Sequence, residues 1–106
     1  MPRSPIDYYV LDAICFDAEQ LDDMVAFLNE SDSEWRSRFE RSIQRPEVLA
    51  ALMRLVRDGL IAVAVPDPAG EDLEVCGEGV WPARPIGEMF FDLTGRGQVL
   101  YLNWDS

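Results

Sequence analysis

The sequence predicts a single α+β domain over residues 1–106: three to four helices, then a small antiparallel unit of short strands, then a short closing helix. Apolar residues recur at helical spacing as far as residue 60. Beyond that point the pattern changes to short β-branched runs separated by proline and glycine clusters. At 106 residues and 48% apolar composition, the chain can bury one core without disulfides or a metal.

The first helix is marked by its capping residues. Ser4 is suited to the N-cap, Pro5 to the first helical position, and Asp7 to the positive end of the helix dipole. A strand is the alternative for residues 8–16, because that run is rich in β-forming residues. The capping pattern favours the helix.

Two further helix starts follow. Asp17, with Gln20 three residues later, predicts the start of a second helix, and Ser31, three before Glu34, that of a third. The second helix has an amphipathic face made of Leu21, Met24, Val25 and Leu28. The third has a narrow apolar stripe made of Trp35, Phe39 and Ile43.

The fourth helix has the clearest pattern. Pro46 fits its first position, and Gly59 fits the residue just after its end, with Leu60 placed for the apolar contact of a Schellman cap. The spacing of its apolar residues predicts a helix buried in the core. These residues are Leu49, Leu52, Met53, Val56 and Leu60.

The remaining segments predict the β part and the closing helix. Residues 61–65 form a β-branched run that ends in a turn cluster at 66–70. Further strands are predicted at 73–76 and 89–93, separated by a loop at 77–87. Thr94 is placed to cap a last helix that reaches Trp104.

Composition argues against most catalytic chemistry. The chain has no histidine, so it lacks an imidazole base and a histidine metal ligand. Cys15 and Cys76 are far apart, which excludes a CxxC motif and favours two small buried side chains. Neighbouring acids such as Asp22 and Asp23 point apart on a helix. We therefore predict a non-enzymatic protein with no cofactor and no metal.

The charge of the chain is strongly negative but uneven. Its net charge is −11, yet all nine basic residues are arginines, and six of them lie between residues 35 and 57 with only two glutamates. That segment has a net charge of +4. The arginines could contact an anion, or they could pair with carboxylates of the chain itself.

The apolar stretches are too short to cross a membrane, since a spanning helix needs about 20 apolar residues. Asp7 and Asp12 interrupt the N-terminal apolar run, which is untypical of a secretory signal. We therefore expect a cytoplasmic protein.

Two runs resemble the winged helix-turn-helix family. The run LMRLVRDGLI at 52–61 resembles the end of a recognition helix that leads into the first wing strand. The run FFDLTGRG at 90–97 resembles the second wing strand and the closing helix. The resemblance implies a winged-helix-like fold, with DNA contacts from the helix at 46–58 and from the wing. The chain departs from the family by placing about fifteen residues, 30–44, between the second helix and the helix at 46–58, where a tight turn is usual.

The resemblance does not fix the function. Six acids and one arginine lie at 66–88, so a wing there would repel DNA. A protein–protein interaction or regulatory module, or self-association, is therefore the favoured hypothesis, with Trp81 and Arg84 as contact candidates. Trp81 could instead cover the core.

Two alternatives remain open. One is a DNA-binding transcriptional regulator that uses the arginine-rich helices at 32–57, with Arg45, Arg54 and Arg57 as contacts. The other is an acidic antidote or mimic that neutralises a basic partner, since the net charge is strongly negative.

Overall fold

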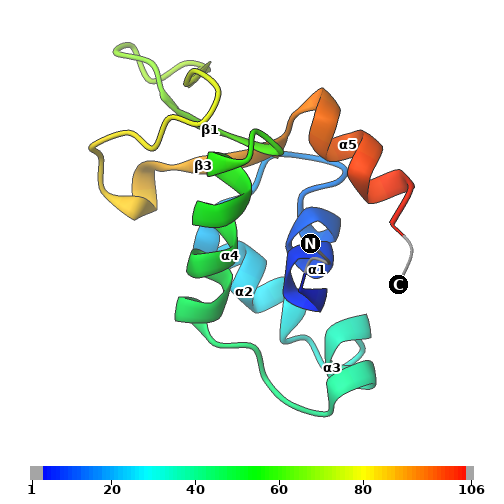
Figure 1. Cartoon of the computed structure of the whole chain (residues 1–106). Helices are drawn as coiled ribbons and strands as arrows, with labels where there is room; N and C mark the ends of the chain where they lie inside the picture. Colours follow the sequence, from blue (N-terminus) through cyan, green and yellow to red (C-terminus); the bar gives the residue numbers. More distant parts are fainter. Residues whose placement is uncertain (1–3, 105–106) are drawn as a thin grey trace.

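The computed structural model describes residues 4–104. This part of the chain folds into four helices, a three-stranded antiparallel sheet and a closing helix, a winged-helix-like α+β arrangement (Figure 1). The helices are α1 (Pro5–Ala13), α2 (Leu21–Leu28), α3 (Glu34–Phe39), α4 (Arg45–Arg57) and α5 (Gly95–Leu102). The strands are β1 (Ile61–Pro66), β2 (Leu73–Val75) and β3 (Phe90–Leu93), with a short 3₁₀ turn, η1 (Ile86–Glu88), before β3.

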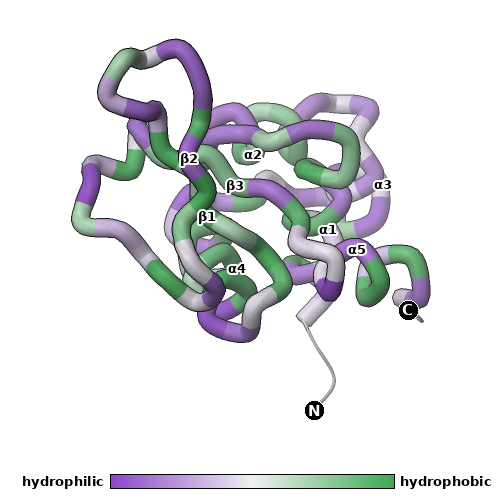
Figure 2. The backbone as a smooth tube through the Cα atoms, turned by 90° about the horizontal axis from the view of Figure 1, so that it is seen from above, coloured by the Kyte–Doolittle hydropathy of each residue, from purple (hydrophilic) through white to green (hydrophobic). Residues whose placement is uncertain are grey.

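β1 is the central strand of the sheet, in the order β2-β1-β3. Ala64 lies opposite both Val75 of β2 and Phe90 of β3. The free edge of β3 is paired at one point by the connection between α1 and α2, where Glu19 and Phe91 exchange backbone hydrogen bonds of 3.1 and 2.8 Å. The β1–β2 hairpin projects beyond the helices, and hydrophilic residues predominate around its turn (Figures 1 and 2). The turn of this hairpin therefore lies away from the helices, whereas β3 is held by contacts with them.

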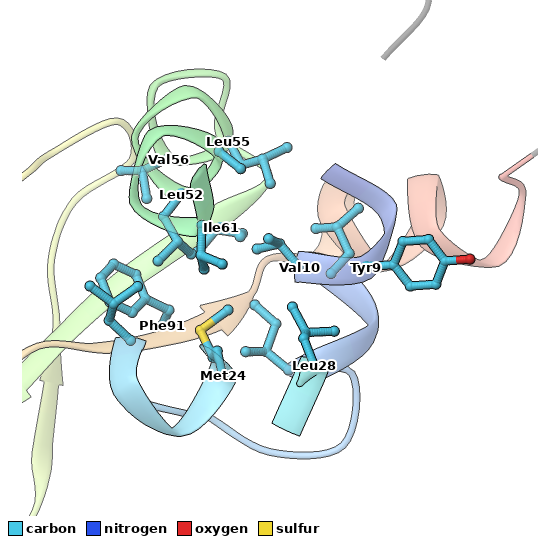
Figure 3. Packing of buried hydrophobic residues seen from close by; sticks show 14 of the residues in the cluster. Tyr9, Val10, Met24, Leu28, Leu52, Leu55, Val56, Ile61 and Phe91 are labelled. Carbon is cyan, nitrogen blue, oxygen red and sulfur yellow. The ribbon is translucent and has the colours of Figure 1, made fainter. Parts of the chain in front are cut away.

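The core lies between the sheet and helices α1, α2 and α4. Val10, Met24, Leu52 and Phe91 are buried and converge from these three helices and from β3 (Figure 3). Burial of each such side chain contributes about 1.5–3 kcal/mol before conformational entropy is counted. This shared core holds α1 and α2 in place against the sheet.

The end of α4 matches its prediction. Gly59 has a positive φ of 76° and donates to the carbonyl of Val56 at 3.0 Å, while Leu60 donates to that of Leu55 at 2.9 Å. These two bonds define a Schellman cap, which turns the chain directly into β1.

The predicted buried side of α4 was wrong in part. Val48 and Ala51, which are not among the residues predicted to be buried, lie in the core, whereas Met53 is 51% exposed. Apolar residues occur on more than one side of this helix, so the contacts with α1 and α2 decide which side is covered.

The capping residues of α1 and α5 are confirmed. Ser4 accepts a hydrogen bond from the amide of Ile6, so residues 5–13 are helical and not a strand. Thr94 accepts one from Gly97 at 3.0 Å, although α5 ends at Leu102 and not at Trp104.

The predicted starts of α2 and α3 were wrong. The pairing of Glu19 with Phe91 keeps the chain extended, so α2 begins only at Leu21 and Asp17 does not cap it. In α3 the capping residue is Ser33, not Ser31. Glu40 adopts a left-handed conformation that ends α3, which places Ile43 outside the helix.

No helix in the described part of the chain is long and apolar enough to span a membrane.

Candidate functional site

The three arginines predicted as anion contacts each face a carboxylate of the same chain. Arg45 Nε lies 2.8 Å from Asp22, and Arg54 Nη2 lies 2.7 Å from the buried Asp7. Arg57 is the loosest of the three, at 3.5 Å from Asp58. The structure thus spreads these arginines along α4 and engages them internally instead of gathering them into one open basic patch.

The other arginines of the basic segment are engaged as well. Arg41 forms two hydrogen bonds with Glu47, of 3.1 and 3.0 Å, and these lower the pKa of the Glu47 carboxyl. Arg36 donates to the carbonyl of Asn29 at 3.1 Å. Arg38 lies over the ring of Phe39 at 5.2 Å and reaches the phenol oxygen of Tyr9. Four of the six arginines in this segment therefore face a carboxylate, whereas Arg36 and Arg38 contact neutral groups and keep their positive charge.

Trp81 and Arg84, the predicted protein contacts, lie in the long loop between β2 and β3. The Trp81 ring is half-buried, with its centre 5.7 Å from that of Phe91, so it covers one side of the core. Arg84 lies 3.6 Å from Glu88, four residues further along the chain. Neither side chain stands free as an anchor for a partner.

A different surface, between α1 and α2, has the features of a binding site. A cavity of about 290 Å³ opens there, with Ala13, Met24 and Phe27 among its apolar lining residues. Phe16, in the connection between the two helices, is 99% exposed beside it, and Phe27 is 44% exposed. Single exposed apolar residues are common, but here two exposed phenylalanines line the same hollow.

Four carboxylates surround this surface, which we call the acidic groove; they are Asp12, Asp17, Glu19 and Asp23. None of the residues that line it is basic. Among residues 4–104, no arginine pairs with any of these four carboxylates. The groove therefore keeps its negative charge, unlike the neutralised surface of α4.

The sides of the groove are held by interactions with the rest of the fold. Asp12, near the end of α1, accepts a 2.5 Å hydrogen bond from the phenol of Tyr101 in α5. Glu19 is held by its backbone pairing with β3, and the side-chain amide of Gln20 donates to the carbonyl of Gly87 at 2.6 Å. Met24 is fully buried beneath the cavity. A groove held in this way loses little conformational freedom when it is occupied.

The contact between Tyr101 and Asp12 also affects protonation. The hydrogen bond to the carboxylate raises the pKa of the Tyr101 phenol well above its usual range, with burial as the next cause. The Tyr101 phenol is neutral, so it leaves the negative charge of Asp12 uncompensated.

The acids of the groove do not converge on one point. Within residues 4–104, no group of three or more histidine, cysteine, aspartate or glutamate side chains is placed to hold a metal ion. The carboxylates border an apolar hollow instead, which suits recognition of a mixed apolar and cationic surface.

The groove was not predicted from the sequence, because its key residues resemble core residues. Phe16 lies in an apolar run of the kind that is usually buried in a core. The spacing of the apolar residues does not show that α1 ends before Phe16. A signal was present at Phe27, which lies outside the periodic face of Leu21, Met24, Val25 and Leu28. A large aromatic residue away from the apolar face of a helix is a useful indication of an exposed contact.

Comparison of the chain with protein-family models, with curated proteins and with solved structures gives no match.

Proposed function

We propose that this protein is a non-catalytic, winged-helix-like module that binds a partner protein through the acidic groove. The observation that carries the proposal is the complete exposure of Phe16 beside an apolar cavity with uncompensated acids. Covering one such side chain is worth about 1.5–3 kcal/mol, a contribution that only a partner can supply here. Phenylalanine is also among the residue types enriched at protein interfaces.

The charge distribution supports a protein partner over DNA. In the winged-helix reading, α4 and the β1–β2 hairpin would face the duplex, yet Arg45, Arg54 and Arg57 are paired with acids of the chain. The hairpin turn adds Glu71 and Asp72, both exposed. Phosphate binding would require breaking internal ion pairs while approaching like charges, and both effects weaken association.

Site-specific photo-crosslinking in cells that produce the protein tests the proposal. Phe16 is replaced by the photo-reactive analogue p-benzoylphenylalanine, and in a matched control the same group replaces Leu102, which is 70% exposed on α5. We expect a discrete protein adduct from position 16 that is absent from position 102. An adduct sensitive to nuclease, or none from position 16, would overturn the proposal.

A further inference from the structure

We infer that the acidic groove receives a partner segment that presents one apolar side chain flanked by arginine or lysine residues. This inference rests on the proposed function and specifies the chemistry of the occupant. The cavity of about 290 Å³ accounts for the apolar anchor, and the surrounding acids account for the flanking cations.

The size of the cavity indicates a side chain as the occupant. At about 290 Å³ the cavity is at the lower end of the volumes that take small-molecule ligands, about 300–1,000 Å³. Half of its lining residues are apolar, Ala13, Met24 and the two phenylalanines, and the other half are carboxylates, which would repel the phosphate or carboxylate groups that many cofactors carry. An aliphatic side chain in this cavity would contact Phe16 and Phe27, which both line it, and would bury part of each ring together with its own surface.

The carboxylates around the cavity determine which residues can flank the apolar anchor of the partner segment. Asp17 and Glu19 come from the connection between the helices, whereas Asp12 and Asp23 come from α1 and α2. An anchor in the cavity would thus have carboxylates on both helices and on the segment that joins them. A segment with acidic neighbours would meet like charges at each of these positions, whereas arginine or lysine would meet opposite charges.

A second copy of this chain does not meet these requirements. Its net charge is −11, and each arginine among residues 4–104 already has a partner within the chain. Self-association through this surface would also bring two acidic grooves near one another. The occupant is therefore a basic segment of a different protein.

Amide shift mapping by NMR with synthetic peptides tests the inference, because it detects weak binding and locates it. The probe peptide has a central leucine with two arginines on each side. One comparison peptide has alanine in place of leucine, and a second has glutamates in place of the arginines. We expect the probe to shift the amide signals of residues 12–27, the alanine peptide to bind about tenfold more weakly, and the glutamate peptide not to bind.

Matched variants of the protein separate the two parts of the recognition. Phe16→Ala should weaken binding of the probe about tenfold, whereas Leu102→Ala, which changes another exposed apolar residue outside the groove, should leave it unchanged. Asp17→Asn combined with Asp23→Asn should weaken binding about fivefold at low salt. Glu71→Gln combined with Glu74→Gln makes the same change in charge on the hairpin and should have no effect.

Four results would overturn the inference: no shifts at millimolar probe, shifts centred outside residues 12–27, equal binding of the glutamate peptide, or Phe16-dependent self-association in light scattering. The outcome is separable from that of the photo-crosslinking experiment. A protein adduct from position 16 without peptide binding would retain the proposed function and reject a basic segment as the occupant. Absence of both would reject the two together.

Discussion

The side chain of Asn29 binds both backbone polar groups of Ile43, fourteen residues further along the chain. Its amide nitrogen donates to the Ile43 carbonyl at 2.9 Å, and its oxygen accepts from the Ile43 amide at 2.7 Å. Ile43 is buried in a segment without regular structure, so these groups lack the partners that a helix or strand would supply. The Asn29 side chain thus supplies the two hydrogen bonds that a neighbouring strand would otherwise give to Ile43, and it fixes the position of the α3–α4 connection.

Replacing Asn29 should therefore destabilise the fold. We expect Asn29→Ala to lower the free energy of unfolding by about 2–3 kcal/mol, since it leaves a buried donor and a buried acceptor unpaired. Urea denaturation followed by circular dichroism measures the change. Asn103→Ala is the matched control, because its amide bonds only to the exposed end of α5 and should cost less than about 1 kcal/mol. Equal effects of the two substitutions would contradict this account of Asn29.

Gly97 should tolerate no side chain. A Cβ atom at this position would lie 1.9 Å from the carbonyl oxygen of Leu60, which is backbone and cannot move aside cheaply. We expect Gly97→Ala to cost about 3 kcal/mol or more through strain between α5 and the start of β1. Gly95→Ala in the same helix meets no atom within 4 Å and should be neutral or stabilising by up to about 1 kcal/mol. Thermal unfolding of the two variants under the same conditions measures this difference in stability.

Stability should fall at alkaline pH partly because of Tyr101. The hydrogen bond to Asp12 raises the pKa of this phenol in the folded state, whereas in the unfolded chain it returns to about 10. Its contribution is therefore fully present below about pH 10 and is lost as the pH rises above that value. The pKa of Tyr8 is raised as well, mainly by burial, so it adds an effect of the same sign.

The variant Tyr101→Phe isolates this contribution. Without the phenol the protein should be less stable at neutral pH, but its urea midpoint should fall less steeply between about pH 9 and pH 11. An unchanged pH dependence in the variant would show that the contact between Tyr101 and Asp12 does not control the alkaline behaviour.

Phe16 should matter for binding and not for folding. Because its side chain is fully exposed, Phe16→Ala should change the free energy of unfolding by less than about 0.5 kcal/mol. Phe91→Ala, which empties the centre of the core, should cost about 3–5 kcal/mol. Chemical denaturation of both variants checks the contrast. A large loss of stability in Phe16→Ala would mean that this residue packs against the protein.

Duplex DNA should not be retained by the protein at physiological salt. We expect no shift in electrophoretic mobility at micromolar protein, because Arg45, Arg54 and Arg57 pair with carboxylates and the net charge is −11. Arg54→Ala should instead reduce stability, since it removes an ion pair from the buried Asp7. Specific retardation that is lost in Arg57→Ala would favour the DNA-binding alternative.

Prediction from residue patterns succeeded where the deciding interactions are local. Ser4 and Thr94 cap their helices through amides two or three residues away, and Gly59 ends α4 through bonds within its own turn. Such interactions need no distant partner, so the neighbouring residues suffice to predict them. The starts of α2 and α3 were missed because pairing and packing with other segments moved the caps.

The sequence by itself predicts the order of helices and strands. It also determines the acidic net charge and excludes chemistry that needs histidine. It does not determine the position of the candidate site. Whether Phe16 lies in the core or in solvent depends on where α1 stops and on the pairing of Glu19 with Phe91, seventy-two residues away in sequence. The pairing of the arginines is likewise a property of the assembled fold, because Arg54 and Asp7 meet only when α4 packs on α1. Local preferences determine where helices and strands form, whereas long-range contacts determine which side chains stay exposed to a partner.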